Sequence, residues 1–290
     1  MSFSPPFVHR FQAMTVPCEV QLYYSEKAAD IAALIESNTL RLEQKFNFYD
    51  SQSWLNQQVN QRQSSSVVLD DESYAVFEVL KRLVDGTKGV FDPTVGTVKS
   101  MMASTPQLDR NAAYEGAKAF MGVDAWSLSD KTLSIPHAET QFDLGGVITE
   151  FAVDQAVMIA ETFGVSSALV NFGGDIRALG TKPDGSPFNV AVLNPKNKHE
   201  PFFSLPLADA ALTTSAHYER SFQFGDEESS HILSQRGTHP QVLSVSVLAP
   251  TTLEAGVLST ALTLEPTLPV PEQVGVVFID DQLALSLIHI

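Results

Sequence analysis

Three short loops of the sequence combine glycine with an aspartate, a pattern typical of nucleotide-binding sites. They are FDPTVG (91–96), DLGG (143–146) and NFGGDIRALG (171–180). Glycine lets the backbone approach a ligand closely and exposes N–H groups to anionic oxygens. Asp92, Asp143 and Asp175 supply carboxylates that can accept hydrogen bonds from ribose hydroxyls or ring nitrogens. Each loop alone is also typical of a structural turn, so the three together favour a nucleotide ligand and leave the structural interpretation open.

The stretch LEAGVLSTAL (253–262) has the spacing of an amphipathic helix but holds a glycine inside it. Gly256 destabilises such a helix by about 1 kcal/mol relative to alanine. Thr260 lies one turn further on the same side. The sequence therefore raises the question why the chain accepts a glycine at 256 and what faced Thr260.

Charge and composition exclude several classes of function. The 290 residues include 18 basic and 34 acidic side chains, and the net charge of −16 repels nucleic acid, which is not expected as a partner. The sequence contains no GxxxxGK[ST] phosphate loop, no GxSxG elbow and no HExxH zinc helix. No apolar run reaches the roughly 18 residues of a membrane span.

Cys18 is the only cysteine, which excludes a disulfide framework and a thiolate metal cluster. An acylated cysteine would need a basic start and an apolar stretch of about 7–15 residues before it. The preceding MSFSPPFVHRFQAM does not have that pattern, so Cys18 is predicted to be a buried strand residue. As given, the protein is expected in the cytoplasm, and in the periplasm only if an exported precursor was trimmed.

The periodicities predict helices and short strands that position these loops. Helices are expected at 26–49, 70–89, 149–164 and around Gly256, and strands at 18–24, within 166–180, within 188–247 and at 274–280, with a hairpin at 125–136. The stretch 99–125 is only weakly patterned. The mixture predicts an α+β architecture with antiparallel sheets and a single domain over 1–290.

Two helices carry more specific predictions. In the first, Ile31, Leu34, Ile35 and Leu42 are expected on one apolar stripe. In the second, Asp70 or Asp71 is the expected N-cap, and Gly86 or Gly89 the expected end.

The order and the amino-acid sequences of these stretches resemble those of the FAD:protein FMN transferases, the ApbE family once named for thiamine biosynthesis. FQAM is similar to the family's Phe-x-Ala-Met-Gly-Thr, FYDSQSWL to its Tyr-Asp-x-x-Ser segment and GVFDPTVG to Gly-Ala-Phe-Asp-Pro-Thr-Val-Gly. DLGGVITEFAVD resembles Asp-Leu-Gly-Gly-Ile-Ala-Lys-Gly-Tyr-Ala-Val-Asp, and LVNFGGDIRALG is nearly identical to its counterpart. TTSAHYERSF, SHILSQRGTHP and LEAGVLSTAL resemble the three C-terminal motifs.

The resemblance implies a fold and an activity. The fold is α+β, related to the T-fold, with two similar lobes and a flavin cleft between them. Such enzymes bind FAD and Mg²⁺, split the pyrophosphate, attach FMN to a threonine or serine of a partner and release AMP, or hydrolyse FAD to FMN and AMP. The implied partners are subunits of sodium-pumping NADH:quinone oxidoreductases (Nqr), Rnf complexes or other exported flavoproteins.

The resemblance also implies roles for individual residues. The flavin contacts carried over are Met14, Tyr49, Val90, Phe91, Asp92, Asp143, Thr149 and Ile232, to which the loop argument adds Asp175. The Mg²⁺ positions are the Gly146 carbonyl, residue 256 and Thr260, because a carboxylate and a hydroxyl four residues apart on a helix suit an oxygen-loving ion. His231 is the candidate general base for the acceptor hydroxyl, and the alternative is a core or rim histidine without a catalytic role.

The sequence departs from the family mainly at these ligand positions. The family has aspartate where this chain has Gly256, and its Lys-Gly pair is Thr149 and Glu150 here. Its Ser-Gly-Asp-Tyr has become SAHY, with Ala216 and His217, and its Asp-Pro-Arg-Thr-Gly has become SQRGT (234–238). The alternative function is therefore a catalytically silent flavin- or partner-binding paralogue without Mg²⁺ chemistry.

Two substitutes for the missing aspartate stay open. Glu150 can supply the charge from the opposite side, or it can merely favour the dipole at the start of its helix. A new metal site from His217, His231 and His239 is the second alternative. Gly256→Asp is expected to strengthen Mg²⁺ binding.

Overall fold

The computed structural model combines antiparallel strands with helices and describes residues 5–23, 25–216, 221–224, 227–230 and 242–290. The strands are β1 (Phe7–Ala13), β2 (Val16–Leu22), β3 (Ser66–Val68), β4 (Ser127–Ser129), β5 (Thr132–Ser134), β6 (Ala168–Phe172), β7 (Asp175–Leu179), β8 (Phe188–Asn194), β9 (Asn197–Leu207), β10 (Ala211–Ala216), β11 (Ser221–Phe224), β12 (Glu227–Ser230), β13 (Ser244–Ala249), β14 (Gly275–Ile279) and β15 (Leu285–Ile288). The helices are α1 (Ala28–Phe46), α2 (Asp71–Gly86), α3 (Gly96–Ser104), α4 (Arg110–Ala117), α5 (Gly145–Thr162) and α6 (Thr252–Leu264), with a π-helical turn η1 (Leu55–Asn60) and a 3₁₀ turn η2 (Lys118–Phe120).

Eight strands form one continuous antiparallel sheet in the order β1-β2-β6-β7-β10-β13-β14-β15. A small sheet has the order β3-β5-β4, and β8–β9 and β11–β12 are separate hairpins. The predicted α+β class with antiparallel sheets is confirmed.

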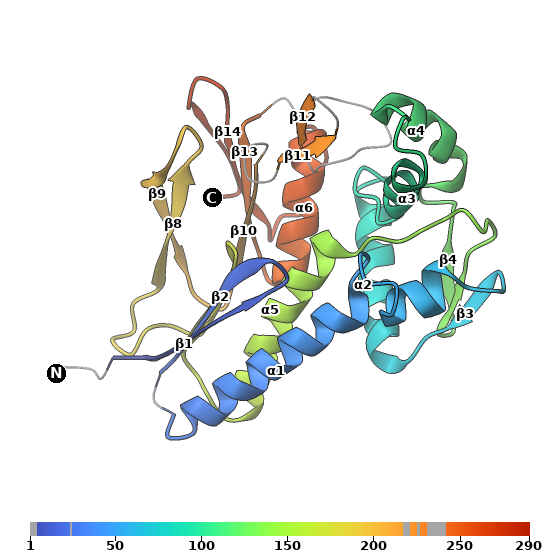
Figure 1. Cartoon of the computed structure of the whole chain (residues 1–290). Coiled ribbons are helices and arrows are strands. Elements are labelled where there is room, and N and C mark those ends of the chain that lie inside the picture. Colours follow the sequence, from blue (N-terminus) through green and yellow to red (C-terminus); the bar gives the residue numbers. More distant parts are fainter. Residues whose placement is uncertain (1–4, 24, 217–220, 225–226, 231–241) are drawn as a thin grey trace.

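Helices α1, α5 and α6 cover one face of the large sheet (Figure 1). Helix α1 packs on β1, α5 packs on β6 and β7, and α6 packs on β10 and β13. The β8–β9 hairpin covers the other face, where Phe188 and Val190 join Ile176, Leu212 and Val277 in one apolar cluster. The side chains of β8 alternate between buried and exposed, as a strand with one covered face requires.

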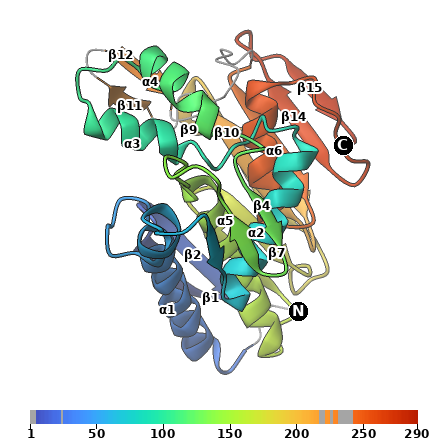
Figure 2. The same ribbon diagram turned by 90° about the vertical axis from the view of Figure 1, so that its right-hand side faces the viewer.

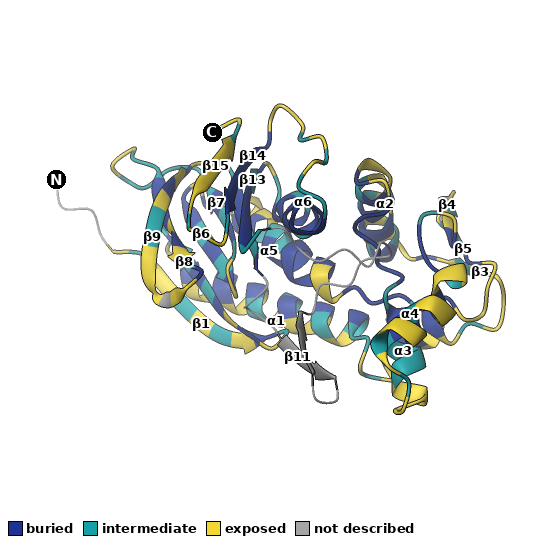
Figure 3. Ribbon diagram, turned by 90° about the horizontal axis from the view of Figure 1, so that it is seen from above, coloured by how far each residue is buried: buried dark blue, intermediate teal, exposed yellow. Residues whose placement is uncertain are grey.

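Helices α2, α3 and α4 and the small sheet lie beyond this helical layer, as the turned view shows (Figure 2). The helix α6 is buried almost all round, and Figure 3 shows it beside the equally buried middle of α5. A helix in this position contacts neighbours on every side. Any gap in its surface must therefore be filled by one of them.

The predicted secondary structure is confirmed at most positions. Asp70 caps α2 by accepting a hydrogen bond from the Ser73 N–H, and Cys18 is buried in β2. One prediction is wrong: Leu34 is 44% exposed, because α1 packs through the narrower stripe that includes Ile31 and Ile35. In the described part of the chain, no helix is long and apolar enough to cross a bilayer.

Other elements differ from the prediction or were not predicted. The helix α5 begins at Gly145, four residues before the predicted start at 149, so the DLGG loop runs directly into it. The weakly patterned stretch 99–125 holds most of α3 and all of α4, whose small core is built on Val98 and Ala113. The edge strands β1 and β15 were not predicted either.

Candidate functional site

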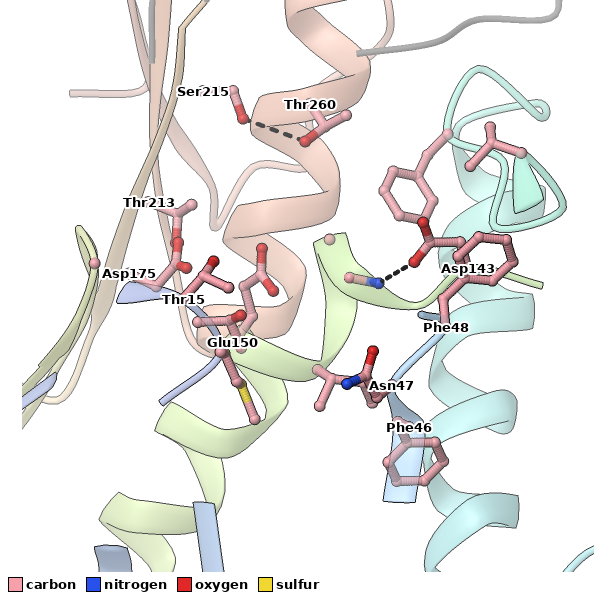
Figure 4. Close-up of a pocket in the computed structure, with 18 of the residues that line it drawn as sticks. Thr15, Phe46, Asn47, Phe48, Asp143, Glu150, Asp175, Thr213, Ser215 and Thr260 are labelled. Carbon is pink, nitrogen blue, oxygen red and sulfur yellow. Dashed lines mark hydrogen bonds between the residues drawn. The ribbon is translucent and has the colours of Figure 1, made fainter. Parts of the chain in front are cut away.

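A cavity of about 620 Å³ lies between the helical layer and the 90–99 segment, which is within the size range of small-molecule sites. Seven stretches of chain line it: 14–15, 43–49, 90–99, 143–150, 173–175, 213–216 and Thr260. In Figure 4 the labelled side chains form two groups. Phe46, Asn47, Phe48 and Asp143 lie on one side, and Thr15, Glu150, Asp175 and Thr213 on the other, below Ser215 and Thr260.

The FDPTVG loop is held by hydrogen bonds of its own aspartate. The buried Asp92 carboxylate accepts hydrogen bonds from the Thr94 N–H at 2.9 Å and the Thr94 hydroxyl at 2.5 Å. The hydroxyl oxygen of Thr94 accepts in turn from the Gly122 N–H at 3.0 Å. Asp92 thus orders this wall of the cavity.

The DLGG loop is pressed against the FDPTVG loop. The Asp143 N–H donates to the Pro93 carbonyl at 2.9 Å. A Cβ on Gly96 would lie 2.7 Å from the Gln141 carbonyl oxygen and 2.9 Å from the carbonyl carbon of Phe142, so only glycine fits here. We call these two loops, 91–96 and 141–144, the aspartate wall.

Lys99 and Asp143 form an ion pair inside the cavity. Lys99 Nζ lies 2.5 Å from Asp143 Oδ2, while Asp143 Oδ1 accepts the Gly145 N–H at 2.9 Å. Lys99 Nζ also reaches the Tyr49 hydroxyl at 3.4 Å and lies over the Phe48 and Tyr49 rings. Burial, the largest single effect, lowers the pKa of Lys99, but the Asp143 carboxylate and the Tyr49 hydroxyl together raise it by more, so the pKa lies above its ordinary 10.5 and the ammonium stays charged.

The opposite side of the cavity is the contact between α5 and α6, which we call the helix junction: Gly146, Thr149 and Glu150 on α5 with Gly256 and Thr260 on α6. A Cβ on Gly256 would lie 2.6 Å from both Cγ and Oε1 of Glu150. Glu150 is only 7% exposed. Its side chain therefore occupies the space beside Gly256, in the second turn of α5 and not at its start.

Hydroxyl groups of α6 and β10 lie next to the helix junction. Ser215 Oγ lies 3.2 Å from Thr260 Oγ1 and 2.8 Å from Ser259 Oγ (Figure 4). The Ser259 hydroxyl donates to the Gly256 carbonyl at 3.0 Å. Gly146 departs from helical geometry, with φ −92° and ψ 25°. Hydroxyl oxygens of α6 and β10 thus meet at this end of the cavity, which Gly146 of α5 also lines.

Two tight turns complete the site. Met14 and Thr15, which join β1 to β2, both have positive φ, at 52° and 64°. The family has glycine where this chain has Thr15, and a β-branched residue with positive φ is strained. The Met14 N–H donates to Glu43 Oε1 at 2.8 Å, which fixes this turn to α1. Gly173 and Gly174 place Asp175 at the start of β7.

Most residues singled out from the sequence line this one cavity. These are Met14, Tyr49, Val90, Phe91, Asp92, Asp143, Gly146, Thr149, Glu150, Asp175 and Thr260. Gly256 contacts the site through Glu150. His231 and Ile232, with His217, His239 and the SQRGT segment, lie outside the described residues.

The described lining residues carry an excess of negative charge. The acidic ones are Glu43, Asp92, Asp143, Glu150 and Asp175, against the single basic residue Lys99. Nevertheless, among the residues that the structure describes, no three His, Cys, Asp or Glu side chains come together closely enough to hold a metal. A cation here would need carbonyl and hydroxyl ligands beside a carboxylate.

Two residues that the sequence reasoning missed stabilise the site. Lys99 had one usable signal, a lone cation among small and apolar residues just after the FDPTVG loop. Asp154 Oδ1 accepts the Thr252 N–H at 2.9 Å, and its Oδ2 accepts the Leu253 N–H at 3.0 Å. Arg177 Nη1 bonds to Asp154 Oδ1 at 2.6 Å. Asp154 thereby attaches the start of α6 to α5, which sets the helix junction.

Comparisons with known proteins point to one family. A sequence model of the ApbE family matches residues 14–270. The FAD:protein FMN transferase of Treponema pallidum is 28% identical over 274 residues, which cover 84% of this chain and 74% of that protein. The protein of the same name from Haemophilus influenzae is 28% identical over 195 residues, covering 62% of this chain and 56% of that protein.

The fold has solved counterparts. The crystal structure of the ApbE protein from Thermotoga maritima superimposes with a TM-score of 0.83 at 24% identity, covering 97% of this chain and 96% of that one. The apo form of the flavinyl transferase ApbE from Pseudomonas stutzeri gives a TM-score of 0.77 at 21% identity, covering 99% of this chain and 97% of that one. At these identities the likeness establishes the fold.

Proposed function

The chain belongs to the ApbE family, and from this premise we propose that it binds FAD in the cavity and transfers FMN to a hydroxyl of an acceptor flavoprotein. The acceptor residue is a threonine or serine, and AMP is released. Hydrolysis of FAD to FMN and AMP is the same cleavage with water as the acceptor. The observation that carries the proposal is the convergence of seven stretches of chain on one cavity of about 620 Å³.

The aromatic and apolar lining supports flavin binding. Phe46, Phe48 and Phe91 offer ring faces or edges against which an isoalloxazine or adenine ring can pack. Tyr49 is 70% exposed, so it is accessible to a ligand at the opening. The aspartate wall offers the Asp92 and Asp143 carboxylates as acceptors for ring N–H groups or ribose hydroxyls.

The transfer itself is a displacement at phosphorus. The acceptor oxygen forms a bond to the phosphorus of the FMN half, the bond from that phosphorus to the bridging oxygen breaks, and AMP leaves with the bridging oxygen. The proton of the acceptor hydroxyl passes to a base. On the family resemblance we assign that role to His231, which lies outside the described residues.

A divalent cation, Mg²⁺, is part of the proposal. When bound, it would absorb negative charge on the pyrophosphate oxygens. The Gly146 carbonyl and the Thr260 hydroxyl line one cavity with acidic side chains, and such a set of oxygen ligands fits Mg²⁺. The acidic lining supports this requirement, since five carboxylates and one lysine would otherwise repel an anionic pyrophosphate.

A second function is favoured by one observation, the glycine at position 256 where the family has aspartate. Without that carboxylate, the protein would be a flavin- or partner-binding paralogue without cation-dependent cleavage. The fold is compatible with both functions, because activity depends on the site.

Incubation of the full chain with FAD, Mg²⁺ and a recombinant acceptor domain of an Nqr or Rnf type separates the two functions. The transferase predicts AMP in chromatography and flavin fluorescence on the acceptor in a denaturing gel, both abolished by a chelator. A thermal midpoint raised by FAD with no AMP formed would favour the silent binder. If neither AMP nor a midpoint shift appears, both functions are rejected.

A further inference from the structure

We propose that Glu150 supplies the cation-binding carboxylate of this protein, and that Gly256 is a glycine because it admits that side chain. The inference rests on the cation requirement of the proposed function. Compared with the family motifs, the acidic residue then lies on α5 instead of α6, and the glycine lies on α6 instead of α5. The family's motifs have glycine at 150 and aspartate at 256, and this chain has Glu150 and Gly256.

The geometry of the helix junction carries the proposal. Glu150 Cγ and Oε1 both lie 2.6 Å from the position that a Cβ of residue 256 would take. A Cβ on residue 256 and the side chain of Glu150 would therefore occupy the same space. An aspartate at 256 and a glutamate at 150 cannot both occupy it without movement.

The surrounding oxygen donors match a carboxylate placed there. Thr260 lies one helical turn after Gly256 on α6, and Gly146 lies one turn before Glu150 on α5. Glu150, Gly146 and Thr260 all line the same cavity. A carboxylate from α5, a carbonyl from α5 and a hydroxyl from α6 form an oxygen set of the type that Mg²⁺ accepts, with water or pyrophosphate oxygens completing the coordination.

The contact between α5 and α6 fixes where the Glu150 carboxylate lies. Asp154, one turn after Glu150 on α5, accepts the backbone N–H groups of Thr252 and Leu253 at the start of α6. This anchor fixes α6 against α5 one turn before Gly256. The Glu150 side chain is therefore held between two rigid elements, which is the condition for a precise ligand.

A packing role is the competing interpretation, in which Glu150 only fills the gap beside a glycine. The isosteric variant Glu150→Gln distinguishes the two, because it keeps the shape of the side chain and removes its charge. Glu43→Gln is the matched control, since Glu43 lines the same cavity and its hydrogen bond from the Met14 N–H survives with an amide oxygen.

The experiment is a calorimetric titration of Mg²⁺ and of Mn²⁺ into the metal-free full chain, alone and saturated with ADP. Glu150→Gln is expected to weaken cation binding by about tenfold or more, with Glu43→Gln within about threefold of the unmodified protein. Thermal unfolding of the metal-free variants checks that both remain folded.

Unchanged cation affinity in Glu150→Gln, or no cation binding by the unmodified protein, would overturn the inference. Its failure is distinguishable from that of the proposed function. A chain that cleaves FAD although Glu150→Gln binds Mg²⁺ normally keeps the function and loses the inference. A chain whose Mg²⁺ affinity depends on Glu150, but which releases no AMP, supports the inference and contradicts the function.

Discussion

The aspartate wall and the helix junction both depend on a glycine with a close neighbour, but the neighbours differ in kind. At Gly96 the neighbour is the backbone of 141–143, which cannot move without disrupting the loop that carries Asp143. At Gly256 the neighbour is the side chain of Glu150. An overlap with backbone atoms cannot be relieved by substituting a neighbouring residue. An overlap with a side chain can be relieved in this way, because a side chain of either packed helix can fill the same space. At the wall this chain has the residues of the family motifs that it resembles, and at the junction Thr149, Glu150 and Gly256 depart from them.

The largest effect is expected at the wall. Gly96→Ala should lower the free energy of unfolding by about 3 kcal/mol, because the new methyl group would overlap backbone atoms that have no space to move into. Gly86→Ala is the control, since apart from its chain neighbours and the nearby backbone of its own helix no atom lies within 4 Å of a Cβ there. Urea unfolding of both variants measures the contrast, and equal stabilities would contradict the assignment of Gly96 as a backbone-fixed position.

An intermediate effect is expected for the ion pair on the wall. Lys99→Met should lower the free energy of unfolding by about 2 kcal/mol, because the nearly buried Asp143 carboxylate loses its charged partner. The folded pKa of Lys99 is raised, so the pair's contribution is complete below the ordinary value of 10.5 and is lost as the pH rises through the raised value.

The measurement for that pair is the stability difference between the unmodified protein and Lys99→Met as a function of pH. It should be constant near neutral pH and shrink in alkali. Burial raises the pKa of Cys18 to about 11, but this titration is common to both proteins and cancels in the difference. A difference that grows with alkaline pH would contradict the pairing.

The smallest effect on stability is expected at the helix junction, and its sign should depend on whether Glu150 is present. Gly256→Ala alone should lower the free energy of unfolding by about 1 kcal/mol, because the overlap with Glu150 outweighs the gain in helix propensity. In a Glu150→Ala background the same substitution should stabilise the protein by about 1 kcal/mol, because only the propensity gain remains. A double-mutant cycle in urea measures both. The same sign in both backgrounds would show that Glu150 is not the obstacle.

Features set by local sequence could be predicted, and features set by long-range contacts could not. The cap at Asp70 depends on Ser73 three residues away, and the predicted helix begins where expected. The pairing of Lys99 with Asp143 joins residues 44 apart, and the bonds from Asp154 to Thr252 and Leu253 span 98 and 99 residues. No periodicity within one segment indicates such partners.

The role of Glu150 shows the same limit more sharply. Its sequence position allowed two interpretations, a dipole effect at the start of a helix or a substitute acid. The structure begins α5 at Gly145 and directs Glu150 at Gly256, a contact that only the packing of α5 on α6 creates. Because a side chain at 256 would meet Glu150, we predict that Gly256→Asp strengthens Mg²⁺ binding only where Glu150 is also replaced.

The most direct test of the account is a reciprocal exchange at the helix junction, with Mg²⁺ affinity as the measurement. Glu150→Gly should weaken Mg²⁺ binding by about tenfold or more, and Gly256→Asp alone should not strengthen it. The double variant Glu150→Gly with Gly256→Asp should bind Mg²⁺ within about threefold of the unmodified protein, because it restores one carboxylate to one space. A double variant that binds as weakly as Glu150→Gly would contradict the account, since the two positions would then not share a carboxylate site.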